Sequence, residues 1–181
     1  QRSLITGAFS TPFGSPNEIR VLSNRLEWQH NFQITKLLLL SAGYQFREQQ
    51  GENDTGLTNR ILSSNAGFAQ AQFNLWDRLF ATAGIRHDSY NVFGDATTYR
   101  LTGGYLHKET DTKIRGSYST GFRAPTMNEL YFPNFGNSQL GTEKSQSMDV
   151  GIDQYFVSKQ LKFTGGYFWN RYRNLITTKF D

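Results

Sequence analysis

The residues best suited to chemistry in this sequence are aromatic and basic side chains in two segments that follow alternating apolar stretches. Flat aromatic rings bind bulky apolar ligands with little loss of conformational entropy, and a guanidinium pairs with anionic groups. The alternative is internal: the rings pack loop against loop, and Arg123 pairs with Glu129. The candidate ligand-binding residues are Tyr90 and Phe93 in the first segment, and Arg123, Tyr131, Phe132 and Phe135 in the second.

Catalytic chemistry has little support in the sequence. The consecutive residues His87, Asp88 and Ser89 contain the residue types of a hydrolytic triad, but neighbours in a strand point to opposite faces of a sheet. No nucleophile-elbow, zinc-protease or phosphate-loop motif occurs. We therefore predict no catalytic residues and a protein that is not an enzyme, with a barrel hydrolase as the least favoured alternative.

The sequence also predicts no metal site and no cofactor. Glu52, Asn53 and Asp54 form an oxygen-rich cluster, but its spacing does not match a calcium-binding loop. The chain contains no cysteine, which excludes disulfides and thiolate sites. The net charge of +4 is spread along the chain without a lysine- or arginine-rich run, so we expect no nucleic-acid partner.

The elements that position these residues are indicated by a period of two in the hydrophobic pattern. In residues 79–88, for example, Leu79, Ala81, Ala83 and Ile85 alternate with Thr82, Gly84, Arg86 and other polar or small residues. No segment shows a convincing helical period with capping residues. The pattern predicts nine strands, at residues 4–10, 25–34, 37–47, 65–75, 79–88, 99–105, 113–120, 147–156 and 161–170.

The expected connections alternate between short and long. Tight turns are predicted at 34–36, 76–78, 108–111 and 157–160, and long polar loops at 11–24, 48–64, 89–98 and 122–144. Successive hairpins then place all tight turns at one end and all long loops at the other, as in outer-membrane barrels. A large soluble sheet with one wet face is the alternative. The longest apolar run, residues 37–40, is too short for a membrane-spanning helix.

The two faces of the predicted sheet differ in chemistry. One face is apolar with aromatic residues near the strand ends, which suits a girdle at the lipid boundary. The other face is polar and includes Arg47, Arg86, Arg100 and Arg115, which indicates a hydrated or plugged lumen. The predicted fold class is all-β, a transmembrane antiparallel up-and-down β-barrel segment. Because bacterial single-chain barrels have even strand numbers, we expect material missing from both ends.

The segment Ser117–Thr126, SYSTGFRAPT, followed by Asn128-Glu129-Leu130-Tyr131, resembles a signature of TonB-dependent outer-membrane receptors. In that family a strand ends in S-Y-x-T-G-F-[KR]-A-P, an E-L-Y or Q-L-Y element follows, and an N-x-x-L-x-x-E-K-S pattern leads into the next strand. The family usually has proline where this chain has Thr142. The residues that match the second pattern are Asn137, Leu140, Glu143, Lys144 and Ser145.

The resemblance implies a barrel of about 22 strands closed by an N-terminal plug. Residues 1–181 would be part of that barrel, with the plug absent from this chain. The implied location is the bacterial outer membrane, and the implied partners are outer-membrane lipid, a small-molecule nutrient complex, and the TonB–ExbB–ExbD system acting through the plug. The implied ligand is cobalamin, a ferric siderophore or haem, with a slight preference for cobalamin. A passive porin or an adhesin-type barrel is the alternative.

Overall fold

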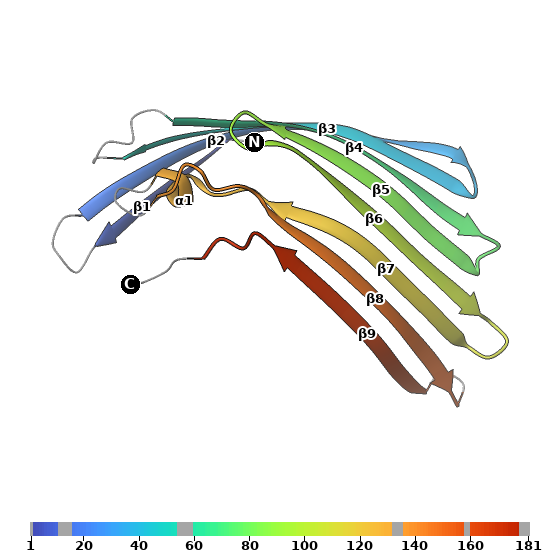
Figure 1. The fold of residues 1–181 in the computed structure, drawn as a ribbon. Coiled ribbons are helices and arrows are strands. Elements are labelled where there is room, and N and C mark those ends of the chain that lie inside the picture. Colours follow the sequence, from blue (N-terminus) through green and yellow to red (C-terminus); the bar gives the residue numbers. More distant parts are fainter. Residues whose placement is uncertain (1, 11–15, 54–59, 132–135, 158–159, 178–181) are drawn as a thin grey trace.

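The chain folds into one curved antiparallel sheet whose strands follow each other in sequence order (Figure 1). The computed structural model describes residues 2–10, 16–53, 60–131, 136–157 and 160–177. Within these residues, the predicted all-β, up-and-down arrangement and the nine strands are confirmed. The strands are β1 (Arg2–Ser10), β2 (Pro16–Thr35), β3 (Leu38–Asn53), β4 (Arg60–Leu75), β5 (Leu79–Tyr90), β6 (Gly94–His107), β7 (Thr112–Arg123), β8 (Glu143–Phe156) and β9 (Leu161–Arg173), with one short helix, α1 (Met127–Tyr131).

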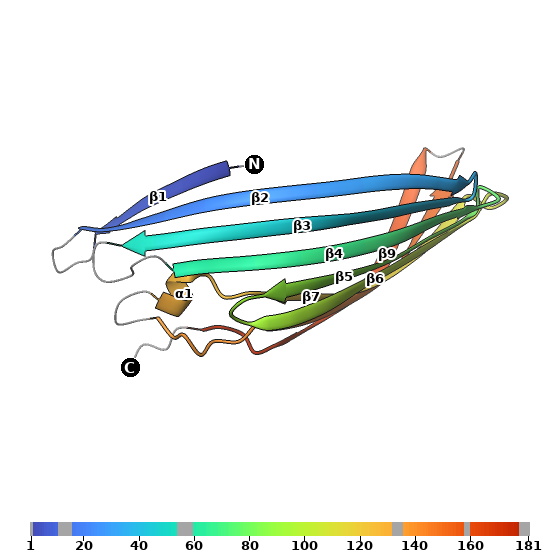
Figure 2. The same cartoon turned by 90° about the horizontal axis from the view of Figure 1, so that it is seen from above.

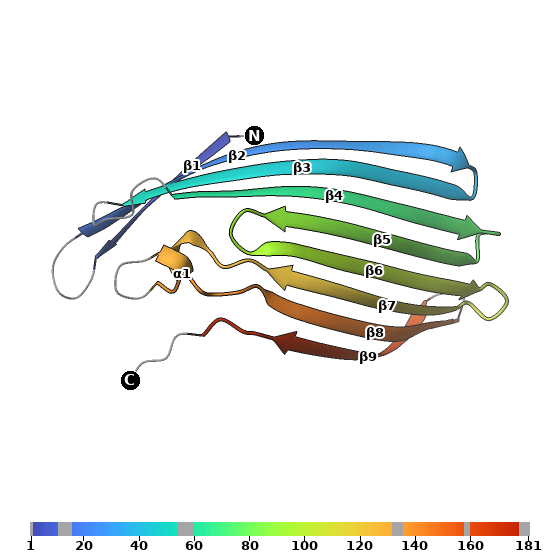
Figure 3. The same ribbon diagram turned by 45° about the horizontal axis from the view of Figure 1, so that its top comes forward.

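The sheet forms a curved wall whose two ends differ in structure. In Figure 3 the strands run side by side from β2 to β9, and the turns that follow β2, β4 and β6 gather at one end of the wall. Helix α1 lies at the opposite end, next to the start of β4 (Figure 2). β1 and β9 are the two edges of the sheet in the described part of the chain. We call the end that carries α1 the outer end.

The strand register confirms the predicted alternation, because directly opposed residues lie on the same face of a sheet. Two adjacent rows cross the wall from β2 to β9. The first row contains Phe32, Leu40, Ala71, Ala83, Leu101, Tyr118, Met148 and Trp169. The second row, on the other face, contains Asn31, Ser41, Gln70, Gly84, Arg100, Ser119, Ser147 and Asn170.

The apolar face is open to the surroundings. The exposed fractions of Trp28, Phe163 and Tyr167 are 57%, 64% and 61%. An apolar surface of this extent is stable against lipid rather than water, so the wall disfavours the soluble-sheet alternative. No helix among the described residues is long and apolar enough to cross a membrane. Among the residues whose side chains the structure describes, the buried hydrophobic ones are Leu62, Ala66, Ala96, Met127 and Leu130.

The predicted long loops at the outer end were wrong in extent. β2 already begins at Pro16, β3 continues to Asn53, and β4 begins at Arg60, so most of residues 16–24 and 48–64 are strand. Backbone ladder bonds do not depend on side-chain polarity. Above the lipid both faces are wet, and the hydrophobic alternation that marks a strand in the sequence disappears there.

The hairpin between β5 and β6 differs most from its prediction. The expected ten-residue loop at 89–98 is a tight turn of Asn91, Val92 and Phe93. Gly94 follows with φ at +76°, a conformation that glycine adopts without strain. At the other end, the predicted turns at 76–78 and 108–111 are confirmed, and the first turn lies at Lys36–Leu37.

Candidate functional site

A cavity of about 470 Å³ lies on the polar face at the outer end. It is located between the parts of β2–β4 nearest the outer end and the segment that follows β7. Of the predicted ligand-binding residues, Tyr90 and Arg123 line this cavity. Phe93 and Tyr131 lie outside its lining, and Phe132 and Phe135 are outside the described residues. The lining residues are Val21, Arg47, Gln49, Leu62, Ser64, Tyr90, Phe122, Arg123, Ala124, Pro125, Thr126, Met127 and Asn128.

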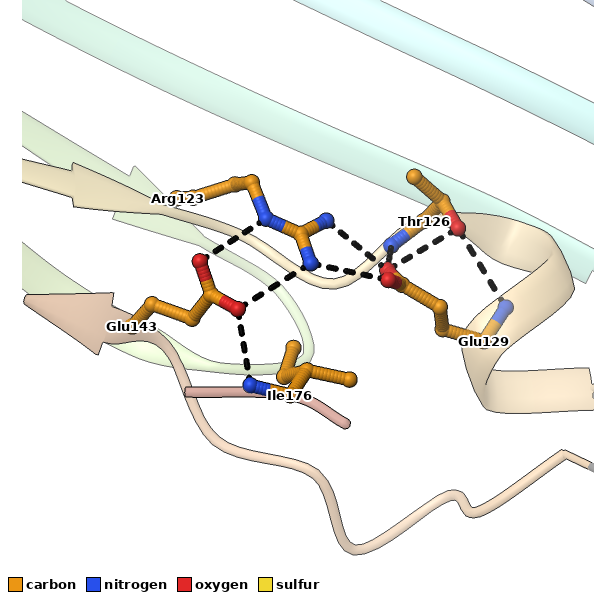
Figure 4. A network of polar contacts seen from close by, with 5 residues as sticks. All are labelled: Arg123, Thr126, Glu129, Glu143 and Ile176. Atoms are coloured by element: carbon orange, nitrogen blue, oxygen red, sulfur yellow. Dashed lines mark hydrogen bonds and ion pairs between the residues drawn. The ribbon is translucent and has the colours of Figure 1, made fainter. Parts of the chain in front are cut away.

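Arg123, the last residue of β7, is held by two carboxylates (Figure 4). Its Nη1 and Nη2 donate to Glu129 Oε2 and Oε1 at 3.0 and 2.8 Å, which confirms the predicted pair with Glu129. Its Nε and Nη2 also donate to Glu143 Oε2 and Oε1 at 2.9 and 3.2 Å. Glu143 matches a family pattern in the sequence, but that pattern does not predict its contact with Arg123. We call Arg123, Glu129 and Glu143 the arginine cluster.

Glu143 links three parts of the chain. It opposes Arg123 in the β7–β8 ladder, and its Oε1 accepts a hydrogen bond of 2.7 Å from the backbone N–H of Ile176, beyond β9. The same cluster therefore joins the ends of β7 and β8 to the segment after β9 (Figure 4). The segment between β7 and β8 is tied in a second way, since Asn137 N donates to the carbonyl oxygen of Glu129 at 2.8 Å.

Helix α1 starts with a reciprocal capping box. Thr126 N and Oγ1 donate to Glu129 Oε2 at 2.7 and 3.0 Å, and Glu129 N donates to Thr126 Oγ1 at 3.2 Å. The sequence pattern predicts no helix here, and this prediction is wrong. The Thr-x-x-Glu spacing after Pro125 is the signal that would have found it. Glu129 thus begins the helix and holds Arg123 at the same time.

Helix α1 is anchored by buried side chains. Pro125 is fully buried, and the exposed fractions of Met127 and Leu130 are 6% and 2%. The guanidinium carbon of Arg60, at the start of β4, lies 5.2 Å from the ring centre of Tyr131. These contacts fix one side of the cavity against the wall, which a loop without packing would not do.

The arginine cluster is fully charged at neutral pH. Hydrogen bonding to Arg123 holds the pKa of Glu129 at about 2, below its ordinary value of 4.5. The same two carboxylates raise the pKa of Arg123. With one guanidinium and two carboxylates, the cluster carries a net negative charge. Arg123 therefore contributes to the cavity mainly by holding its neighbours in place.

The aromatic part of the site centres on Tyr90, the last residue of β5. Its ring lies 5.8 Å from those of both Phe93 and Phe122, measured between ring centres. The hairpin that carries Tyr90 is fixed by Asn91, whose Nδ2 donates to Ile61 O and whose Oδ1 accepts from Ser63 N, both at 3.0 Å. The Tyr90 ring is thus presented to the cavity from a rigid turn.

The inner wall below the cavity is polar, as predicted for the four arginines. Arg86 donates from Nη2 to Asp88 Oδ1 at 2.8 Å and to Gln45 Oε1 at 2.7 Å. The Nε of Arg115 lies 3.8 Å from Oδ2 of Asp153. Asp88 and Asp153 are buried beneath these cations. The polar face of the wall therefore carries paired charges and amides in fixed positions.

His87, the histidine beside Asp88 and Ser89, does not lie at this site. His87 opposes Gly67 and Thr97 on the apolar face, which we call the outward face, and its Nδ1 lies 2.8 Å from Thr97 Oγ1, so it points away from the cavity. The part of the chain that the structure describes contains no group of three or more His, Cys, Asp or Glu side chains that could hold a metal. The cluster of residues 52–54 falls partly outside the described residues.

Comparison with known proteins gives matches along the whole chain. The family model described as TonB dependent receptor-like, beta-barrel matches residues 2–181. The vitamin B12 transporter BtuB of Vibrio vulnificus (strain YJ016) is 31% identical over 162 residues, which cover 87% of this chain and 25% of that protein. The vitamin B12 transporter BtuB of Photobacterium profundum is 26% identical over 139 residues, covering 76% and 23%.

Solved structures agree in fold. The siderophore receptor PirA from Pseudomonas aeruginosa superposes with a TM-score of 0.76 at 18% identity, covering 94% of this chain and 38% of that one. A mutant of the ferric enterobactin receptor PfeA from Pseudomonas aeruginosa, in complex with enterobactin, gives 0.72 at 18% identity, covering 88% and 28%.

The chain spans about a quarter of the length of the curated relatives it matches. Those relatives are transporters, and the matched structures are receptors, rather than enzymes. The match of the family model from residue 2 to residue 181, together with the open wall of antiparallel strands, shows that this chain belongs to the TonB-dependent receptor family of outer-membrane β-barrels.

Proposed function

We propose that this chain is part of an outer-membrane receptor that binds cobalamin at the outer end of its barrel and imports it with TonB-derived energy. The observation that carries the proposal is the cavity on the inner wall, where Tyr90 and Arg47 face the space between the strands and α1. An aromatic ring on a rigid turn, with a cation beside it, suits a bulky ligand that carries both apolar and anionic groups. The vitamin B12 transporters among the relatives support cobalamin as that ligand.

The proposed mechanism uses differential binding. The ligand is captured at the outer cavity, and a plug elsewhere in the full-length protein fills the lumen. The inward arginines, such as Arg86 and Arg115, would then face the plug, and their pairing with Asp88 and Asp153 keeps the wall rigid while the plug moves. TonB, acting on the plug, would supply the energy for ligand release to the inside.

Ligand identity is tested by binding of the full-length receptor to cobalamin, haem and a panel of ferric siderophores. Submicromolar binding of cobalamin alone supports the proposal. Binding only of a siderophore or of haem refutes cobalamin but keeps the nutrient-receptor class. If the receptor binds none of the three kinds of ligand, the assignment as a receptor for these nutrients is refuted.

Energy coupling is tested by uptake of labelled cobalamin in cells with and without a functional TonB system. The proposal expects accumulation only in the cells with TonB. Equal uptake in both strains would instead indicate a passive porin. A matched strain that carries a transposon at an unrelated outer-membrane gene controls for changes in envelope permeability.

A further inference from the structure

The outward face of the wall carries a group of cations at the outer end of β8 and β9. Lys144 opposes Arg173, and Arg171 opposes Gln146, in the β8–β9 ladder. All three cations are exposed, and none of them forms an ion pair with a described residue. They lie on the same face as Met148 and Trp169, which form the next opposed pair on this face after Gln146 and Arg171, further from the outer end. We call Lys144, Arg171 and Arg173 the basic patch.

The basic patch lies at the height of the lipid head groups. On β9 the outward apolar side chains run from Leu161 through Phe163 and Tyr167 to Trp169, and Arg171 is the next outward residue. A tilted strand needs about 9–11 residues to cross the hydrocarbon layer, and the span 161–169 fills it. Trp169 then sits at the lipid–water boundary, and the cations stand directly above it.

A cavity of about 230 Å³ adjoins the basic patch, which contributes three of its lining residues. It lies where β6 and β7 separate. Their ladder ends at Arg100 and Ser119, and Tyr99 N donates instead to the Thr120 side chain at 2.8 Å. Asp95 also lines the cavity, but it lies 3.9 Å from His87, on the side of β5.

A separate apolar groove lies next to this cavity on the outward face. The groove has a volume of about 670 Å³, and alanines such as Ala71 and Ala83 form its floor between larger residues such as Phe32 and Tyr118. Tyr99 lines both the groove and the cavity. The two hollows therefore meet at Tyr99, with the cations lining the first hollow and alanine methyl groups lining the second.

We propose that the basic patch and the groove form one binding site for a phosphorylated lipid of the outer leaflet. The phosphate binds Lys144, Arg171 and Arg173, and an acyl chain lies in the groove over Ala71 and Ala83. Charge complementarity at head-group height and an adjoining apolar channel both indicate this occupant. The proposal rests on the membrane placement of the barrel and not on the identity of the nutrient.

The head-group contact is tested on the full-length receptor by native mass spectrometry after exchange into phosphatidylcholine vesicles that contain diphosphoryl lipid A. The variant Arg171→Gln/Arg173→Gln should retain about 30-fold less lipid A, since each cation at an anionic lipid surface contributes about fivefold. The matched control Lys36→Gln/Lys108→Gln removes two cations at the opposite end of the wall and should retain lipid A like the wild type. Equal retention by all three proteins, or an equal loss in both variants, overturns the proposal.

The acyl contact has its own test. Ala83→Leu fills the groove on a surface that faces lipid, so the barrel should still fold, as circular dichroism and heat-modifiable migration will show. The proposal expects reduced lipid A retention in this variant with the basic patch intact. If Ala83→Leu retains lipid A fully, or if inorganic phosphate displaces lipid A from the wild type, the site is a simple anion site and the proposal is wrong. Cobalamin binding, measured in parallel, reports separately on the proposed function.

Discussion

Arg123 and Glu143 face each other across the last rung of the β7–β8 ladder, with the Arg123 Nε 2.9 Å from Glu143 Oε2. The same guanidinium holds Glu129, which caps α1. The Arg123 side chain therefore lies at the end of β7, pairs with the first residue of β8 and positions the helix that forms one side of the cavity. This arrangement gives the arginine of the S-Y-S-T-G-F-R-A-P segment a structural role.

Replacing Arg123 by glutamine should loosen the segment between β7 and β8. Glu129 and Glu143 would then repel each other without a shared cation, while Thr126 would still cap α1. Loss of ion pairs of this kind shifts the equilibrium between the docked and the open segment by roughly five- to thirty-fold. We expect proteolysis within residues 124–142 of the full-length receptor to accelerate by that factor, and Arg123→Lys to give a smaller effect because lysine lacks the planar fork.

The matched control for this change is Arg78→Gln. Arg78 makes a similar two-bond pair with Glu109, at 3.1 and 2.6 Å, but at the tight turns on the opposite end of the wall. Cleavage of residues 124–142 should be unaffected in this variant. If both variants accelerate cleavage equally, the arginine cluster has no specific role in holding α1.

The docking of α1 should depend on pH only under acid conditions. The pKa of Glu129 is about 2 in the folded protein and 4.5 ordinarily. A lowered pKa contributes stability that is fully present above 4.5 and is lost as the pH falls toward 2. A spin label at the exposed Asn128 should be immobile at neutral pH and become mobile across that window. Glu129→Gln should weaken the pH dependence, because only the lowered pKa of Glu143 then remains in the cluster, and a transition at higher pH would contradict the pairing.

Tyr90 should contribute more to ligand binding than Phe93. Both belong to the predicted aromatic group, but only Tyr90 lines the cavity. Truncation of a central aromatic contact costs more than about 1 kcal/mol, or fivefold in affinity. We expect Tyr90→Ala to weaken cobalamin binding by at least this factor in calorimetry, and Tyr90→Phe and Phe93→Ala to stay near the wild type. A larger loss in Phe93→Ala would show that the ligand contacts the outside of the hairpin.

The face assignment of β5 should be visible in the collision rates of spin labels. Labels at Ala81, Ala83 and Ile85 should be relaxed by oxygen, which partitions into lipid. Labels at Thr82 and Gly84 should be relaxed by a water-soluble nickel chelate. A side chain at Gly84 is tolerated, since a Cβ added there would lie 3.7 Å from its nearest neighbouring atom. The reverse pattern would mean that the polar face contacts lipid and the apolar face contacts water, which would contradict the face assignment.

The sequence by itself determined the repeating part of this protein. Alternation in residues such as Leu79–Ile85 predicts a strand and its two faces, because the side-chain period of a strand is fixed by the backbone. It also predicted the tight turns at 76–78 and 108–111, and the pair of Arg123 and Glu129, which are six residues apart and connected by a short segment.

Only the tertiary structure decided the outer end. The strands continue there as wet ladders without a hydrophobic signal, and the expected loop around Tyr90 is a tight turn. Arg123 meets Glu143 from the next strand, and Lys144 meets Arg173 from β9, because register brings together residues that are far apart in sequence. A local pattern shows which face a residue occupies, but the pairing of distant strands decides which residues share a site.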